Sequence, residues 1–204
     1  MANQDWFKKG IKILIKSDRD LAVIIDSYGS PSQWQRKPGF ATLIRIILEQ
    51  QVSLSSAKKA FERLCNEVTP LTPENFLKLD DIQLKAIGFS RQKTKYGREL
   101  SQAIIKGELD IDALKKLDDL TVKKQLTKIK GIGDWTADMY LMMALQRPDI
   151  FPNKDLAVAI AVKEIKNLDN KPKSEQLESI AQLWQPYRTI ATMILWHYYL
   201  NRKK

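Results

Sequence analysis

Apolar residues recur at helical spacing along almost the whole chain, and this pattern limits the possible folds more than any other feature. It is clear in the segments FATLIRIILEQ, SAKKAFERLCNEV, GRELSQAIIKG and TIATMILWHYYL. Alternation of apolar and polar residues sustained over the length of a strand is absent. The sequence therefore predicts an all-α fold.

Turn-forming segments divide this pattern into about ten short helices. These segments are SYGSPSQWQRKPG, VTPLTPE, IGFS, IKGIGD, RPDIFPNKD and NLDNKPKSE. Residues that cap helix starts precede several of the predicted helices, namely Ser53, Thr72, Asp118 and Ser174. There is no internal repeat, low-complexity tract or long linker, so we expect one body and not separate domains joined like beads.

Composition narrows the class of protein. The chain has 204 residues, 44% of them hydrophobic, which is enough for one ordinary domain or two small lobes. A formal net charge of +10 favours a polyanionic partner, either nucleic acid or an anionic membrane surface. No stretch approaches the roughly 20 apolar residues that cross a bilayer, and the start of the chain lacks the features of a signal peptide, so we expect a soluble intracellular protein. A single cysteine, Cys65, excludes an internal disulfide, a cysteine-based zinc site and a cysteine-ligated iron–sulfur cluster.

The segment LTKIKGIGDWTADMY is the most informative one. A short helix is expected to end before Gly131-Ile132-Gly133, and another to begin directly after it. The N–H groups of such a turn point outward together with the start of the next helix, which makes a site for a phosphate oxygen. Three nearby lysines would add salt-dependent attraction to a DNA backbone: Lys124, Lys128 and Lys130. The alternative interpretation is a plain corner between two helices with a glycine cap.

Together with three other motifs, this hairpin resembles the helix-hairpin-helix glycosylase superfamily, specifically its 3-methyladenine DNA glycosylase II branch. The other motifs are ILEQQVSLSSAKKAFERL, GFSRQK and RPDIFPNKDLAV, and a weaker match, WQPYRTIATMILWHYY, reaches Tyr199. The resemblance implies two helical lobes flanking a DNA-binding cleft. One lobe, residues 40–147, would carry the hairpin, and residues 1–39 and 148–204 would form the second.

The resemblance implies a monofunctional glycosylase of base excision repair, which hydrolyses the N-glycosidic bond of flipped-out alkylated bases. It assigns the catalytic carboxylate to Asp155, which would stabilise the positive charge that develops on the sugar. A second role of Asp155 as a helix cap is compatible with this. Two other carboxylates are expected to be structural: Asp149 as a cap or solvated turn residue, and Asp138 in packing or capping contacts. Bifunctional relatives have a Schiff-base lysine where this chain has Trp135, so we expect no lyase activity.

The same resemblance implies a base pocket formed by Trp135, Trp196, Met139 and Leu156. Met139 and Leu156 stand where a relative has tyrosines, so the pocket is expected to be less aromatic, with a narrower preference or one tilted toward neutral lesions. Four other aromatic residues could replace those tyrosines, although core packing is the favoured interpretation of each: Tyr28, Trp34, Phe40 and Tyr187. His197 is expected to be structural.

Further DNA contacts follow from the resemblance. Gln51 is expected to fill the gap left by the extruded nucleotide, with Gln50 as a neighbouring contact, and a polar turn between helices is the alternative. Ser90 and Lys93 are expected to contact the backbone, with a capped, solvated helix as the alternative. The DNA-binding hairpin itself would comprise Lys130, Gly131, Ile132, Gly133 and Thr136.

We expect no required cofactor and no side-chain metal site, although family members allow a monovalent cation held by backbone carbonyls of the hairpin. The expected partner is double-stranded DNA containing damaged bases, bound by a monomer in the cytoplasm, on the nucleoid if the source is bacterial, and not at a membrane. A noncatalytic DNA-binding or architectural protein with the same hairpin is the main rival. Trp135, Trp196 and Asp155 together argue against it. A basic helical interaction protein is a more distant rival, and it leaves GIGDWTA unexplained.

Overall fold

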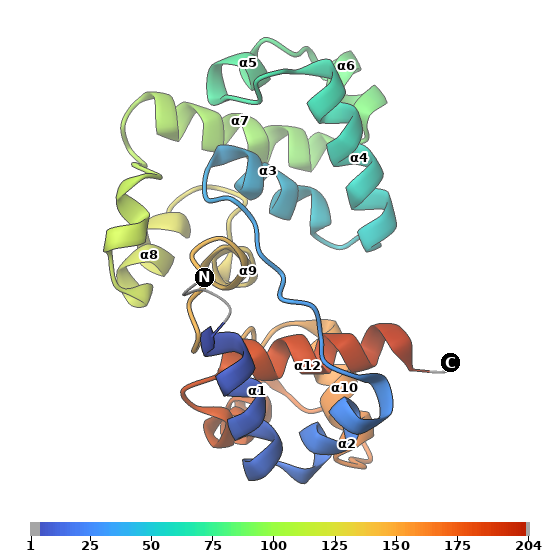
Figure 1. Cartoon of the computed structure of the whole chain (residues 1–204). Coiled ribbons are helices and arrows are strands. Elements are labelled where there is room, and N and C mark those ends of the chain that lie inside the picture. Colours follow the sequence, from blue (N-terminus) through green and yellow to red (C-terminus); the bar gives the residue numbers. More distant parts are fainter. Residues whose placement is uncertain (1–4, 203–204) are drawn as a thin grey trace. The chain divides into compact units, whose positions relative to one another are not determined.

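The computed structural model describes residues 5–202, and within them it contains twelve α-helices, two short 3-10 helices and no strand. The predicted all-α fold class is therefore confirmed. The chain forms two helical units, one built from residues up to Gln35 and from Gln146 onward, the other from Arg36–Leu145 (Figure 1). In the sequence analysis the second of these was placed at residues 40–147.

The first unit combines both ends of the chain, drawn blue and orange to red in Figure 1. Its central helix is α12, which is buried from Thr189 to Trp196 and packs against α1, α2 and α10. The helix is buried on all sides over this stretch, and removing its apolar side chains from water stabilises the unit. Its elements are α1 (Asp5–Ser17), α2 (Arg19–Tyr28), α10 (Leu156–Ile165), α11 (Ser174–Ala181), the 3-10 helix η3 (Gln182–Trp184) and α12 (Arg188–Asn201).

The second unit is built around α3, which packs against α4, α7 and α9 and has seven buried residues. Tyr140 on α9 is fully buried, and its hydroxyl accepts the N–H of Gly39 at 3.0 Å, which ties α9 to the start of α3. Burial raises the pKa of Tyr140 to about 12. The elements are α3 (Phe40–Glu49), α4 (Leu54–Glu67), α5 (Pro73–Leu77), α6 (Asp81–Ile87), α7 (Arg91–Ile105), the 3-10 helix η2 (Ala113–Lys116), α8 (Asp119–Leu126) and α9 (Asp134–Met143).

Three of the four predicted helix caps are confirmed. Ser53, Thr72 and Asp118 each precede a helix and accept a backbone N–H from its first turn. The prediction for Ser174 is wrong, because Lys173 is the residue that precedes α11 and Ser174 is the first helical residue. The Gln176 side chain explains the shift, since it folds back to accept the Lys173 N–H at 2.9 Å and so starts the helix one residue earlier.

A buried carboxylate, Asp18, joins three elements of the first unit. It caps α2 through the N–H of Asp20, accepts the indole N–H of Trp184 at 2.8 Å, and receives the ammonium of Lys166 at 3.0 Å. Burial acts to raise the pKa of Asp18, but the hydrogen bonds from Trp184 and Lys166 outweigh it, so the pKa lies below its ordinary value. Because Lys166 directly follows α10, this cluster fixes the end of α10 opposite to Asp155.

We predict that Asp18→Asn lowers the free energy of unfolding by about 2 kcal/mol at pH 7, since it removes the charge that two donors share. The lowered pKa means that the wild-type advantage is complete above the unfolded value of about 3.9 and declines as the pH falls through the folded value. Urea unfolding of both proteins between pH 7 and pH 2.5 measures this. Asp26→Asn, at an exposed position of α2, is the control, and an equal loss in both variants would contradict the prediction.

Candidate functional site

The hairpin between α8 and α9 is held closed from inside its own unit. Gly131 has a φ of 96°, in the left-handed region, and a Cβ atom there would lie only 2.0 Å from the ring of Tyr96 on α7. Ile132 is buried, and its N–H donates to the carbonyl of Ile129 at 3.0 Å. Glycine is therefore required at position 131 by the fold itself.

Gly133 differs from Gly131. Its φ of −93° suits any residue, and no atom lies within 4 Å of the place where a Cβ would be. It directly precedes α9, and that helix has no side-chain cap. The N-terminal end of α9 thus presents its partial positive charge beside an exposed glycine, which leaves room for the close approach of an anion.

The turn after α3 is tied to the hairpin. The side-chain amide of Gln50 donates to the carbonyl of Gly131 and to the hydroxyl of Thr136, both at 2.9 Å. Gln51, the next residue, is exposed and has a φ of 54°, which is uncommon outside glycine. Internal contacts therefore fix Gln50 and the buried Thr136, while Gln51 stands exposed at the tip of the turn.

Among the other predicted DNA contacts of this unit, Ser90 and Lys93 make internal hydrogen bonds, whereas the lysines near the hairpin are exposed. Ser90 caps α7 by accepting the N–H of Lys93 at 3.2 Å. The ammonium of Lys93 donates to the carbonyl of Leu48 at 2.7 Å, so it closes the C-terminal end of α3, and burial lowers the pKa of Lys93. A backbone contact by Ser90 or Lys93 stays a prediction. The three lysines around the hairpin are exposed: Lys124, Lys128 and Lys130.

In the first unit, Asp155 has the geometry of a held carboxylate. It precedes α10 and is 8% exposed. One oxygen, Oδ1, accepts the N–H of Val158 at 2.9 Å and the indole N–H of Trp196 at 3.2 Å. Asp155 is therefore a helix cap, as the sequence analysis allowed, and its side chain is also fixed against an indole. The Asp155 side chain stands at the N-terminal end of α10.

An aromatic stack extends from this carboxylate. The ring of Trp34 lies on the ring of Trp196 with centroids 5.1 Å apart and an angle of 26° between the planes. Trp34 was expected to pack in the core, but it is half-buried and joins the Trp196 and Asp155 pair. The available signal was its position in a loop, outside any helical pattern of apolar residues.

The competing carboxylates are engaged in ion pairs. Asp149 accepts both the Nε and the backbone N–H of Arg188, so it caps the start of α12. Asp138 pairs with the ammonium of Lys123 at 2.9 Å. These contacts agree with the structural roles expected for both residues. His197 is bonded through a ring nitrogen to the carbonyl of Tyr28, which agrees with its expected structural role.

The predicted pocket residues fall into two sets, one in each unit. Asp155, Trp196 and Leu156 lie together in the first unit, where Leu156 is 57% exposed. Trp135 and Met139 lie on α9 in the second unit, the former half-buried and the latter buried.

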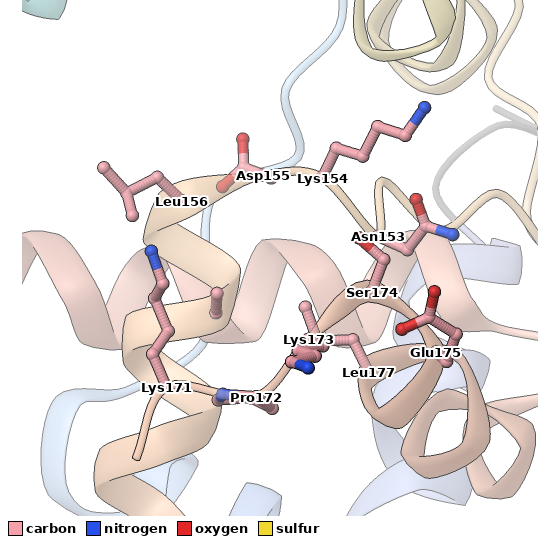
Figure 2. Close-up of a pocket in the computed structure, with 11 residues that line it drawn as sticks. Asn153, Lys154, Asp155, Leu156, Lys171, Pro172, Lys173, Ser174, Glu175 and Leu177 are labelled. Carbon is pink, nitrogen blue, oxygen red and sulfur yellow. The ribbon is translucent and has the colours of Figure 1, made fainter.

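A hollow of about 440 Å³ lies beside Asp155 at the starts of α10 and α11 (Figure 2). Of its lining, only Asp155 and Leu156 were expected from the sequence to belong to the functional site. Lys171 and Lys173 were not expected there, because lysines in a loop between helices are indistinguishable in sequence from ordinary solvated residues. The complete lining is Asn153, Lys154, Asp155, Leu156, Ala159, Lys171, Pro172, Lys173, Ser174, Glu175 and Leu177.

Two kinds of feature are absent from residues 5–202. No group of three or more His, Cys, Asp or Glu side chains in this range could hold a metal ion. Over the same range, no helix has the length and apolar character needed to cross a bilayer.

Comparison with known proteins gives a family and several relatives. The model of the HhH-GPD superfamily of base excision DNA repair proteins matches residues 44–186. The alkylbase DNA glycosidase-like protein mag2 of Schizosaccharomyces pombe is 28% identical over 205 residues, which cover 96% of this chain and 95% of mag2. YfjP of Bacillus subtilis is 32% identical over 162 residues, or 76% of this chain, and the match spans only 56% of YfjP.

A solved structure agrees with these sequence matches. The Schizosaccharomyces pombe 3-methyladenine DNA glycosylase Mag1, in complex with abasic DNA, superposes with a TM-score of 0.86 at 27% identity. The superposition covers 92% of this chain and 95% of the Mag1 chain.

The contrast between the two hairpin glycines gives a prediction. Gly131→Ala should lower the free energy of unfolding by at least about 2 kcal/mol, because it combines a strained φ with a clash against Tyr96. Gly133→Ala should leave it unchanged or raise it by up to about 1 kcal/mol, since alanine fits the backbone there and restricts the unfolded chain. Denaturant unfolding of the two variants measures this. Equal destabilisation by both substitutions would contradict the account of the hairpin.

Proposed function

Because the chain belongs to the HhH-GPD superfamily of base excision DNA repair proteins, we propose that it is a monofunctional DNA-3-methyladenine glycosylase. It hydrolyses the bond between an alkylated base and its deoxyribose in duplex DNA and leaves an abasic site. The single observation that carries the proposal is the buried Asp155 carboxylate, fixed by the Val158 N–H and the Trp196 indole. The names of mag2 and Mag1 support the same activity.

The reaction needs an anion more than an acid. As the bond to the sugar breaks, its electron pair leaves with the base, and positive charge develops on the deoxyribose ring. Alkylation at a ring nitrogen makes the base cationic, so it departs as a neutral molecule without being protonated. A carboxylate that is already oriented stabilises the sugar cation without reorganising at the moment of reaction. A water molecule then adds to C1′, and its proton passes to the carboxylate or to solvent.

The extruded base would be held by aromatic faces. The stacked pair of Trp34 and Trp196 is attached to Asp155, so a base above the carboxylate would lie beside electron-rich rings. Such faces attract cationic purines by cation–π interaction. Leu156, next to Asp155 in the same unit, is a further proposed contact of the base, while Trp135 and Met139 of the other unit stay predictions from the sequence. Since Trp135 is an indole where a lyase would have an amine, the enzyme forms no Schiff base with the sugar.

DNA recognition would come mainly from the hairpin and from net charge. The first turn of α9 with Gly133, and the exposed Lys130, present donors to a backbone phosphate without reading sequence. Gln51 would fill the gap left by the extruded nucleotide, a role supported by its exposure and its φ of 54°. Gln50 and Thr136 would hold that turn in place relative to the hairpin.

The remaining expectations are proposals of the same kind. The protein acts on duplex DNA as a monomer in the cytoplasm and needs no cofactor. The carbonyl of Gly131 already accepts one hydrogen bond, from Gln50, and keeps a second lone pair. Backbone carbonyl oxygens suit hard cations, so a monovalent cation at the hairpin fits this donor set.

The test is single-turnover excision from duplexes that contain 3-methyladenine or 7-methylguanine. Asp155→Asn should reduce the rate by at least about 100-fold, because it removes the charge opposite the sugar. Asp169→Asn, which removes the same charge from an exposed loop of the same unit, should leave the rate unchanged. The released product should be the free base, with the strand intact until alkali treatment.

DNA binding is measured on the same proteins, and Asp155→Asn should bind at least as tightly as wild type, because it lacks the charge that repels the DNA strand. A rate for Asp155→Asn within about threefold of wild type would remove Asp155 from the mechanism. Binding without release of any alkylated base would favour the noncatalytic rival. A nicked strand before alkali treatment would contradict the role given to Trp135.

A further inference from the structure

Lysines outnumber carboxylates in the lining of the hollow beside Asp155. We name the segment Lys171-Pro172-Lys173 together with Lys154 and Ser174 the basic pocket; all five line the same hollow of about 440 Å³ (Figure 2). Its lining includes three lysines, Lys154, Lys171 and Lys173, and two carboxylates, Asp155 and Glu175, and the Lys154 side chain extends away from the other two lysines (Figure 2). Among residues 5–202, neither Lys171 nor Lys173 has an acidic partner within ion-pair distance.

The start of α11 adds to this charge. Lys173 occupies the position that usually holds a Ser, Thr, Asp or Asn side chain, and it provides no acceptor for the first turn of the helix. A lysine at this end lies next to the positive end of the helix dipole, which is unfavourable without a compensating anion. An anion in the basic pocket would relieve the repulsion between Lys171, Lys173 and the helix terminus.

The DNA substrate would supply such an anion. DNA carries one negative charge for each phosphate, and the proposed mechanism brings this polyanion up to the Asp155 carboxylate. Two anions at close range repel each other, so a fixed carboxylate would weaken binding of the very strand that it acts on. Cations beside Asp155 offset this cost while leaving its charge available to the sugar.

We propose that the basic pocket binds a backbone phosphodiester of the strand that carries the extruded nucleotide, adjacent to the sugar that Asp155 faces. The inference rests on the proposed function for the position of that sugar. Lys171 and Lys173 supply the charge, and the Ser174 hydroxyl and the N–H groups at the start of α11 supply further donors. The contact positions the strand and carries no base preference.

The test uses Lys171→Gln/Lys173→Gln and a duplex that contains a tetrahydrofuran abasic analogue, so that binding is measured without any excision. The double variant should bind at least about fivefold more weakly at 0.1 M salt. The slope of log affinity against log salt should decrease in magnitude by about one, as expected for the loss of one phosphate contact. Lys12→Gln/Lys16→Gln removes the same charge from exposed positions of α1 and is the control, with affinity within twofold of wild type.

A second arm identifies the phosphate. Single methylphosphonates, which are uncharged, replace each phosphate near the lesion in turn. One position should weaken wild-type binding but leave the double variant unaffected, and Lys171→Arg/Lys173→Arg should restore the wild-type pattern together with the affinity. Equal losses for wild type and double variant at every position would overturn the proposal, since the lysines would then act only through long-range charge.

Two further outcomes would also overturn the proposal. The first is a double variant that binds DNA as tightly as the control. The second is a double variant that keeps its DNA affinity but is no longer stabilised against thermal unfolding by added inorganic phosphate, which would identify a site for free phosphate. Thermal unfolding of the double variant should match that of the control, because both side chains are exposed. Failure of the proposed function is distinguishable, because a protein that excises nothing can still show the phosphate-specific loss of binding.

Discussion

The position of the Asp155 carboxylate between the Val158 N–H and the Trp196 indole is the constraint on which the rest of the account depends. A carboxylate that is 8% exposed would be costly to bury without such donors. Two donors at 2.9 and 3.2 Å fix one oxygen at the start of α10. The same indole stacks on Trp34, so one contact orients both the proposed catalytic anion and the aromatic surface for a base.

In the other unit, the side chain of one residue connects two turns that are predicted to bind DNA. Gln50 bonds to both the hairpin carbonyl of Gly131 and the hydroxyl of Thr136, and Tyr96 fills the space that a side chain at Gly131 would need. These contacts fix the hairpin, so that less conformational entropy would be lost in the phosphate binding that we propose for it. The polar residues next to them, Gln51 and Lys130, are the exposed ones.

The sequence was sufficient for features that depend on local pattern or on a continuous motif. Helical periodicity predicted the fold class, short capping motifs predicted three helix starts, and the hairpin with the FPNKDLAV segment predicted the family. It was insufficient where a side chain finds a distant partner. Trp34 and Trp196 stack although they lie far apart in the sequence, and the Lys93 ammonium donates to the distant Leu48 carbonyl. A binding role for Lys171 and Lys173 can be proposed only once the structure shows that both line the hollow beside Asp155.

Affinity for a cationic sugar analogue measures directly whether Asp155 stabilises positive charge on the sugar. One duplex carries a pyrrolidine, protonated at neutral pH, in place of the deoxyribose, and the other carries neutral tetrahydrofuran. The wild-type protein should bind the pyrrolidine duplex at least about tenfold more tightly, or by about 1.4 kcal/mol, and Asp155→Asn should show no preference. An equal preference in both proteins, or none in the wild type, would contradict it.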